Sequence, residues 1–430
     1  MSDKNPARLK PNRPKLALHV PEPPFRPGDT PDFSGIKVPA AGEAPRPDIA
    51  VEAEETFPLC THLVRVLDDK GKAVGPWDPK LDADTLRKML KDMKTVRVFD
   101  DRMYRAQRQG KTSFYMKCTG EEAIAVAAAT AMDPEDMHFP TYRQQGLLVA
   151  RGYPLKTMMC QIYSNAGDPL HGRQLPIMYS DKKHGFFSIS GNLGTQVPQA
   201  VGWAMASAIK GDSRICMGWI GDGATAEGDF HSAMTFAAVY QAPVVLAVVN
   251  NQWAISSFSG IAGAEQATFA SRAVGYGIAG LRVDGNDALA VYAAVKWASD
   301  RARTNKGPTL IEFFTYRAEG HSTSDDPTGY RAKGEAEEWP LGDPIERLKA
   351  HLVGLGEWDA DKDAELDKEL DATVRAAQKE AEGMGILPQQ GFDNIPSMFH
   401  DVYHDTPWHV AEQCEQALDE AREFLGHEPK

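Results

Sequence analysis

Two uninterrupted apolar runs constrain the fold of this chain more than any other feature. Residues 214–220 (RICMGWI) and 243–249 (PVVLAVV) have the composition of strands buried on both faces. The stretch between them, 225–240, carries apolar side chains at helical spacing: Phe230, Ala233, Met234 and Ala237. Strand, helix and strand in this order predict a βαβ unit with parallel strands.

A short polar sequence follows each predicted strand. Gly221, Asp222 and Gly223 come after the first, and Asn250 and Asn251 come after the second. Because open α/β sheets bind ligands beyond the carboxyl ends of their strands, we expect Asp222 and Asn251 at one binding edge. The glycines let backbone approach a bulky anion, and the helix that follows favours phosphate at its N-terminus.

The residue types at this edge suit a hard divalent ion that also grips a diphosphate. Asp222 offers a carboxylate and Asn251 an amide oxygen, and a nearby main-chain carbonyl completes the set. This combination is typical of enzymes that use thiamine diphosphate. The alternative is an ordinary βαβ crossover with a turn at each strand end, because Gly-Asp-Gly is a common turn sequence.

Composition excludes several functional classes. The net charge of −13 argues against nucleic acid and against an anionic membrane surface as partners. The five cysteines are irregularly spaced and contain no CxxC pair, which indicates free thiols in a reducing compartment. No apolar run is long enough to span a membrane, and prolines interrupt the basic residues 4–15. We therefore expect a cytoplasmic protein.

Three regions differ in character along the chain. Residues 1–80 are rich in proline and should form an extended arm, although Phe25, Phe33 and the 63–67 alternation suggest that it packs on another surface. Residues 81–345 predict a doubly wound parallel α/β sheet, and residues 346–430 a helical tail. The pattern also predicts a strand over 309–316 and helices over 82–110, 120–132, 288–303, 343–353, 359–384 and 407–424.

The chain supplies only one α/β unit. Thiamine diphosphate chemistry normally needs a second face, which holds the aminopyrimidine against a carboxylate so that the carbon acid can lose its proton. The count of elements therefore predicts an obligate partner chain.

A histidine lies in the loop after the predicted strand 309–316. His321 should reach the same edge as Asp222 and Asn251, since parallel strands end at the same side of a sheet. A histidine there can bind an anion or move protons near neutral pH. The alternative is a solvated loop histidine.

The motifs of this chain resemble a known family. The matching segments are SFYMKCTGEEA, FPTYRQQG, GRQLPIMYS, ISGNLGTQVPQAVGWAMASAIKGD, WIGDGATAEGDFH, VVNNQWAIS, LRVDGND and GHSTSDDP. Together they resemble the alpha subunit of the decarboxylating component of 2-oxo acid dehydrogenases, over residues 82 to 345. HSTSDD is closer to the branched-chain type, and LHVPEP and the helical tail resemble bacterial members.

The resemblance implies a cofactor site with specific residues. The implied magnesium ligands are Asp222, the Asn251 side chain and the Trp253 carbonyl. The implied contacts to thiamine diphosphate are Tyr142, Arg143, Gly191, Leu193, Gly223, Ala224 and His321, with His321 also assisting acyl transfer to a lipoyl group. A structural potassium site is implied at Ser190, Asn192, Thr195 and Gln196.

Other positions carry weaker or divergent matches. Arg317 corresponds to a loop-ordering residue, and Ser322 to a serine that kinases modify in mitochondrial relatives. Val249 stands where some relatives carry a phosphate-binding arginine, so part of that positive charge must come from elsewhere. Gly320 replaces a second histidine, which puts proton shuttling by a pair in doubt.

The resemblance implies a 3-methyl-2-oxobutanoate dehydrogenase (2-methylpropanoyl-transferring), an oxidoreductase with a disulfide acceptor. It would decarboxylate branched 2-oxo acids as an α2β2 heterotetramer with a beta subunit. The acyl group would pass to a lipoyl group on the dihydrolipoyl acyltransferase core. The alternatives are the same subunit of a pyruvate or acetoin dehydrogenase, or a non-catalytic scaffold.

Overall fold

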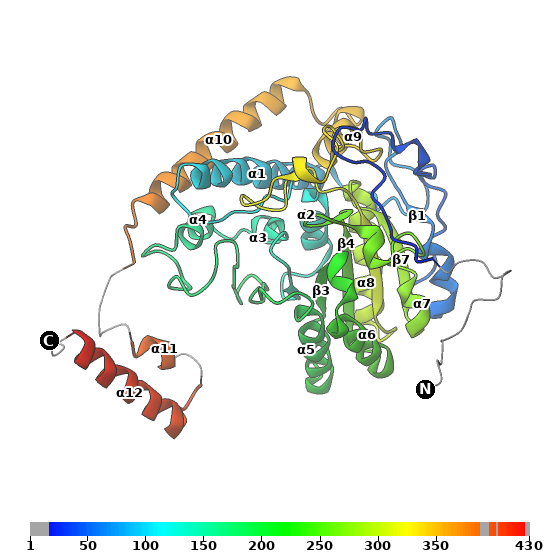
Figure 1. Cartoon of the computed structure of the whole chain (residues 1–430). Helices are drawn as coiled ribbons and strands as arrows, with labels where there is room; N and C mark the ends of the chain where they lie inside the picture. The colour runs from blue at the N-terminus through cyan, green and yellow to red at the C-terminus, as the bar shows by residue number, and fades with distance from the viewer. Residues whose placement is uncertain (1–16, 388–394, 401–402, 426–430) are drawn as a thin grey trace, which may run out of the picture.

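The computed structural model describes residues 17–387, 395–400 and 403–425. Residues 17–387 contain a central sheet with helices on both faces (Figure 1). The sheet has six strands, and every neighbouring pair is parallel. Their order across the sheet is β1 (Leu63–Val64), β7 (Ala279–Asp284), β8 (Thr309–Phe314), β4 (Val244–Asn250), β3 (Cys216–Gly221) and β2 (Met137–Phe139). The predicted α/β fold with a parallel sheet is confirmed.

Alternate residues of the central strands enter two separate cores. Met217 and Trp219 of β3 face the core shared with α1 (Ala83–Arg108), α2 (Glu122–Ala131) and α8 (Ala288–Arg303). Cys216 and Ile220 of the same strand face the core shared with α5 (Gln196–Lys210) and α6 (Gly228–Tyr240). Because side chains of a strand alternate between faces, a strand covered on both sides must be apolar throughout, as the sequence pattern indicated.

Most of the predicted helices are present. Asp82 caps α1 by accepting the Thr85 amide at 2.8 Å, as its position before the helix indicated. The tail contains α9 (Pro344–Gly354), α10 (Ala360–Glu382) and α12 (Trp408–Leu425). The remaining helices are α3 (Gln145–Ala150), α4 (Leu155–Tyr163), α7 (Arg272–Tyr276) and α11 (Ser397–His400). None of the helices described is both long and apolar enough to cross a membrane.

The predicted helix over 225–240 begins later than expected. A four-residue 3-10 turn, η3 (Gly223–Ala226), follows β3, and α6 starts only at Gly228. The predicted buried residues Phe230, Ala233, Met234 and Ala237 do face the core. The expectation that the α6 N-terminus directly follows Gly223 is therefore wrong, and the amides nearest the strand end belong to the 3-10 turn.

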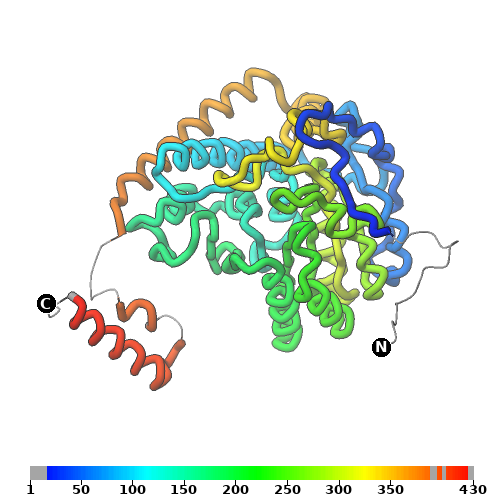
Figure 2. The backbone as a smooth tube through the Cα atoms, in the orientation of Figure 1, coloured from blue at the N-terminus to red at the C-terminus, as the bar shows by residue number. Residues whose placement is uncertain are grey.

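The N-terminal segment packs on the body of its own chain. Figure 2 shows this segment as a dark blue tube that runs along the outside of the body. Phe33 of the short turn η1 (Phe33–Gly35) packs edge-on against Trp339, with ring centroids 5.4 Å apart. A 3-10 helix, η2 (Ala53–Cys60), then leads into β1, which extends the sheet beside β7. The basic residues between positions 4 and 15, which prolines interrupt, lie outside the described part of the chain; they are Lys4, Arg8, Lys10, Arg13 and Lys15.

A small antiparallel hairpin stands beyond the end of β4. It consists of β5 (Trp253–Ala254) and β6 (Ser257–Phe258). Gln252 and Ile255 adopt φ of 74° and 55°, a left-handed conformation that is costly for residues with a Cβ. Such strain is retained where a segment must be held in one position, and this hairpin forms one wall of the cavity described next.

Candidate active site

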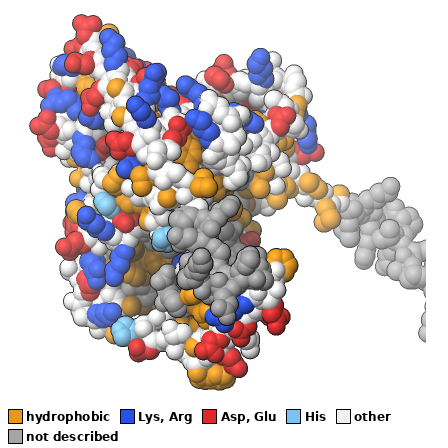
Figure 3. Space-filling model, turned by 90° about the vertical axis from the view of Figure 1, so that its left-hand side faces the viewer, with side chains coloured by type: hydrophobic (Ala, Val, Ile, Leu, Met, Phe, Trp, Pro, Cys, Tyr) orange, Lys and Arg blue, Asp and Glu red, His pale blue; other side chains and the backbone are white. Residues whose placement is uncertain are grey.

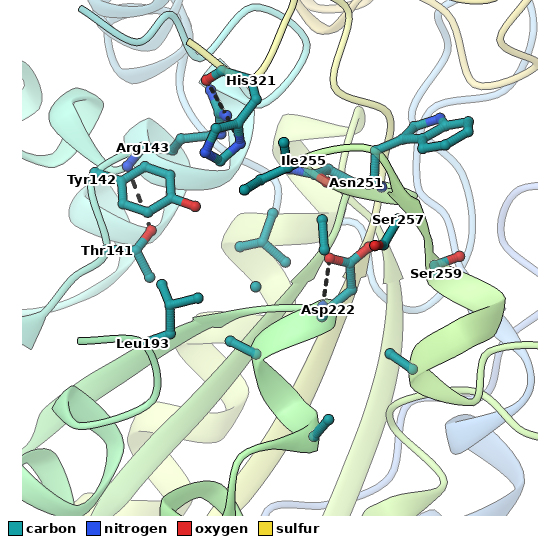
Figure 4. Close-up of a pocket in the computed structure, with 18 of the residues that line it drawn as sticks. Thr141, Tyr142, Arg143, Leu193, Asp222, Asn251, Ile255, Ser257, Ser259 and His321 are labelled. Carbon is teal, nitrogen blue, oxygen red and sulfur yellow. Dashed lines mark hydrogen bonds between the residues drawn. The ribbon is translucent and has the colours of Figure 1, made fainter. Parts of the chain in front are cut away.

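A cavity of about 550 Å³ lies at the carboxyl edge of the sheet. Figure 4 shows Tyr142, Arg143 and His321 gathered on one side, facing Asp222 and Asn251 on the other. The predicted site residues that line the cavity are Tyr142, Arg143, Gly191, Leu193, Gln196, Asp222, Gly223, Ala224, Asn251, Trp253 and His321. Of the predicted residues, Ser190, Asn192 and Thr195 lie outside its lining.

Asp222 is the buried carboxylate at the end of β3. Its side chain is 2% exposed, and its Oδ1 accepts the amide of Gly223 at 2.7 Å. Its Oδ2 is buried and has no hydrogen-bond partner. Burial raises the pKa of Asp222 to about 7, with Glu121 and Glu312 adding to the shift and the Gly223 amide and Arg317 opposing it. A cation beside Oδ2 would satisfy this oxygen and offset the cost of burying the charge.

Asn251 follows the end of β4, as Asp222 follows the end of β3, and both residues line the cavity. Gly221 pairs with Val249, and the Asp222 amide donates to the Val249 carbonyl at 3.2 Å. Among the described residues no three His, Cys, Asp or Glu side chains gather as a metal site. A cation here would therefore depend on one carboxylate with amide and carbonyl oxygens, which is the donor set of a hard divalent ion.

The Trp253 carbonyl is fixed by a buried arginine. Arg317 is 1% exposed, and its guanidinium donates to the carbonyl oxygens of Trp253 at 2.9 Å and Ile255 at 3.0 Å. The same guanidinium donates to the Tyr330 hydroxyl at 2.7 Å, which in turn donates to Asp325. Arg317 thus connects the hairpin wall to the loop that carries His321, a more specific role than the loop ordering that the resemblance implied.

Two glycines flank Asp222 in different surroundings. A Cβ at Gly223 would lie 2.3 Å from the Cβ of Ala254, so the hairpin can approach only a residue without a side chain. A Cβ at Gly221 would meet no protein atom within 4 Å, and Gly221 lines the cavity. Gly223 is thus required by packing, whereas Gly221 leaves the backbone open to the cavity.

Arg143 and His321 form one polar unit. The Arg143 Nη2 donates to the His321 carbonyl at 2.7 Å and lies 3.1 Å from Nδ1 of the same residue. Burial, reinforced by Arg143 and Arg317, lowers the pKa of His321 to about 3. The imidazole is therefore neutral, and because Nδ1 accepts from Arg143, the remaining proton is assigned to Nε2. His321 offers a neutral donor, while the positive charge at this wall belongs to Arg143.

Three of the predicted potassium residues lie in the loop before α5, and the fourth, Gln196, is the first residue of α5. Ser190 Oγ accepts the Asn192 amide at 3.1 Å, and Thr195 Oγ1 donates to the Asn192 carbonyl at 3.0 Å. Gln196 Nε2 donates to the Trp219 carbonyl at 2.7 Å and so attaches the loop to β3. A potassium ion at this loop stays a prediction. Leu193, at the tip of the loop, is 50% exposed although its side chain is apolar.

Glu121 is a lining residue to which the sequence assigned no role. Its carboxylate is 3% exposed and accepts the Asn251 Nδ2 at 2.7 Å. In the sequence Glu121 belongs to a Gly-Glu-Glu segment at the start of a helix, where acidic residues usually stabilise the helix dipole. The sequence pattern therefore could not distinguish the role of Glu121 from that of Glu122. The hairpin residues Ile255 and Phe258 also line the cavity and were likewise not predicted.

Comparisons with known proteins identify the family of this chain. The family described as dehydrogenase E1 component matches residues 90–389. This chain belongs to that family. The N-terminal family of the 2-oxoisovalerate dehydrogenase E1 alpha subunit matches residues 14–54. The predicted resemblance to the alpha subunit of bacterial branched-chain enzymes is confirmed.

Similar curated proteins carry the same subunit name. The 2-oxoisovalerate dehydrogenase subunit alpha of Pseudomonas aeruginosa is 59% identical over 93% of this chain and 98% of its own length. The mitochondrial subunit alpha of Homo sapiens is 38% identical, over 85% of this chain and 81% of its own. The mitochondrial subunit alpha 2 of Arabidopsis thaliana is 39% identical, over 89% and 79%. Membership in the E1 component family implies dependence on thiamine diphosphate, a beta subunit and an acyltransferase partner.

Proposed function

We propose that this chain is the alpha subunit of a 3-methyl-2-oxobutanoate dehydrogenase (2-methylpropanoyl-transferring), with a lipoyl disulfide as acceptor. The observation that carries the proposal is the Asp222 Oδ2, buried without a partner beside Asn251 in a 550 Å³ cavity. This oxygen fits a magnesium ion held by Asp222, the Asn251 amide oxygen and the Trp253 carbonyl. When bound, thiamine diphosphate supplies a nucleophilic carbon and an electron sink for decarboxylation.

The residues of this chain would bind and orient the reactants. The Gly223 and Ala224 backbone and the Arg143 guanidinium line the cavity, and these groups would hold the diphosphate oxygens. Tyr142 and Leu193 narrow the cavity, and Gly191 leaves backbone accessible in the loop beside it. His321 can donate its Nε2 proton to a substrate or acyl oxygen without first becoming charged.

The partner chain would complete the site. We propose that this chain supplies one face of the cofactor pocket and that the beta subunit supplies the other, in an α2β2 heterotetramer. On the face shown in Figure 3, Lys and Arg side chains lie interspersed with Asp and Glu side chains. The expectation that nucleic acid is not a partner rests on the net charge of −13. The five cysteines, free in the structure, support a cytoplasmic location.

Asp222→Ala in the assembled complex tests the proposal. We expect the variant to lose thiamine diphosphate binding in calorimetry with Mg²⁺, because the carboxylate ligand is gone. Normal cofactor binding by Asp222→Ala would contradict it. Wild-type rates on 3-methyl-2-oxobutanoate against pyruvate and acetoin, with the beta subunit and acyltransferase present, separate the branched-chain enzyme from its alternatives. A complex with no cofactor-dependent stabilisation would favour the scaffold.

A further inference from the structure

Two adjacent glutamates at the start of α2 have different environments. Glu122 is fully buried, and its carboxylate accepts from Arg97 at 2.8 Å and from the Gly120 amide at 2.8 Å. Glu121 has a single close donor, the Asn251 side chain, and its nearest cation is the Arg143 Nε at 3.9 Å. The second oxygen of Glu121 is buried with no hydrogen-bond partner. A stable fold rarely retains such an oxygen without a function, because its desolvation is not compensated.

The Glu121 contact determines which atom of Asn251 is free. A side-chain amide carries its oxygen opposite its nitrogen, and the two are exchanged by a half-turn of the amide. A carboxylate only accepts hydrogen bonds, so it holds the nitrogen of Asn251 on its own side. The oxygen, which also accepts the Trp253 amide at 3.3 Å, is then presented away from Glu121.

We propose that Glu121 is a positioning residue that sets the orientation of Asn251, so that its amide oxygen and not its nitrogen is presented to a divalent cation beside Asp222. This inference rests on the proposed function, since it assigns a role at the same cation site. A nitrogen turned toward the cation would bring two N–H donors against it, and the site would lose one of its ligands.

A second buried Asn–Glu pair gives a matched control. Asn250, the preceding residue, donates its side-chain nitrogen to Glu312 at 2.8 Å. Glu312 is fully buried like Glu121, but it does not line the cavity that contains Asp222. Replacing either glutamate by glutamine keeps the size of a buried side chain, and only Glu121 bonds to the proposed ligand.

Glu121→Gln tests the role because glutamine can either accept from or donate to Asn251, so that only the 3.3 Å bond from the Trp253 amide still favours one orientation of the Asn251 amide. The assembled complex is first freed of its cofactor. Thiamine diphosphate is then added at a fixed concentration, and Mg²⁺ binding is followed by calorimetry. We expect the apparent Mg²⁺ affinity to fall about 10- to 100-fold. Glu312→Gln, which removes a carboxyl that acts on Asp222 without touching Asn251, should lower the Mg²⁺ affinity by much less than Glu121→Gln.

A double variant separates positioning from general damage. In Glu121→Gln with Asn251→Asp, the glutamine nitrogen donates to one aspartate oxygen and leaves the other for the cation, so Mg²⁺ affinity should recover. A Glu121→Gln variant with normal Mg²⁺ affinity would overturn the proposal, as would an equal loss in Glu312→Gln or no recovery in the double variant. If Asp222→Ala also binds Mg²⁺ and cofactor normally, the proposed function fails; if only Glu121→Gln is normal, the function stands and this inference alone is rejected.

Discussion

Gly223 gives the most direct test of how the cavity wall is built. A Cβ at this position would lie 2.3 Å from the Ala254 Cβ, whereas ordinary contact begins near 3.4 Å. Gly223→Ala therefore requires the β5–β6 hairpin to withdraw by about 1 Å, since neither atom belongs to a flexible side chain. The Trp253 carbonyl, one residue away on the same hairpin, would move with it.

The size of the effect follows from the geometry of a magnesium ion. Mg²⁺ requires oxygen ligands at about 2.0–2.1 Å, so a carbonyl displaced by about 1 Å no longer binds it. Overpacking of this kind costs about 1–3 kcal/mol. Binding of the cofactor with Mg²⁺ requires the hairpin to return to its original position, so the overpacking energy opposes binding. At about 1.4 kcal/mol for each factor of ten, the affinity for thiamine diphosphate with Mg²⁺ should fall by about 10- to 100-fold.

A rescue variant checks the cause. Cofactor affinity is measured by calorimetry on the assembled complex for Gly223→Ala, Ala254→Gly and the double variant. Removing the Ala254 methyl should restore the affinity of Gly223→Ala to within about 3-fold of the Ala254→Gly variant, a coupling expected only for groups in contact. Gly221→Ala, whose Cβ meets no protein atom within 4 Å, should also weaken the cofactor, but Ala254→Gly should not rescue it. Normal affinity in Gly223→Ala, or no rescue, would refute the reasoning.

Two further predictions concern the loop after β8. Burial lowers the pKa of His321 to about 3 in the folded chain. Between about pH 6.5 and 3, this histidine therefore binds a proton in the unfolded chain but not in the folded one. Lowering the pH through this range thus destabilises the cofactor-free fold. His321→Gln should therefore lose less stability between pH 7 and 5, by about 2 kcal/mol in urea unfolding, and equal losses would contradict the neutral imidazole. Arg317→Lys should expose the loop to limited proteolysis, because lysine cannot reach both the Trp253 and Ile255 carbonyls; unchanged cleavage would argue against this connection.

Much of the fold follows from local pattern. The strands β3 and β4 were predicted because both of their faces are apolar, and α1 because Asp82 precedes its first turn. The strands β1 and β2 were not predicted, because two and three residues are too short for any periodicity. The late start of α6 also escaped prediction, since a 3-10 turn and the first turn of an α-helix have similar residue preferences.

The sequence by itself determined that a carboxylate and an amide follow two adjacent parallel strands, because apolar runs and their polar ends are local properties of the chain. Only the tertiary structure decided what surrounds them. Glu121 reaches Asn251 across 130 positions of sequence, and Arg317 reaches the Trp253 carbonyl across 64. Burial in the same cavity also sets the charge of Asp222 and His321, because it raises the pKa of Asp222 to about 7 and lowers that of His321 to about 3. Desolvation depends on every atom packed nearby, and no short stretch of sequence contains that information.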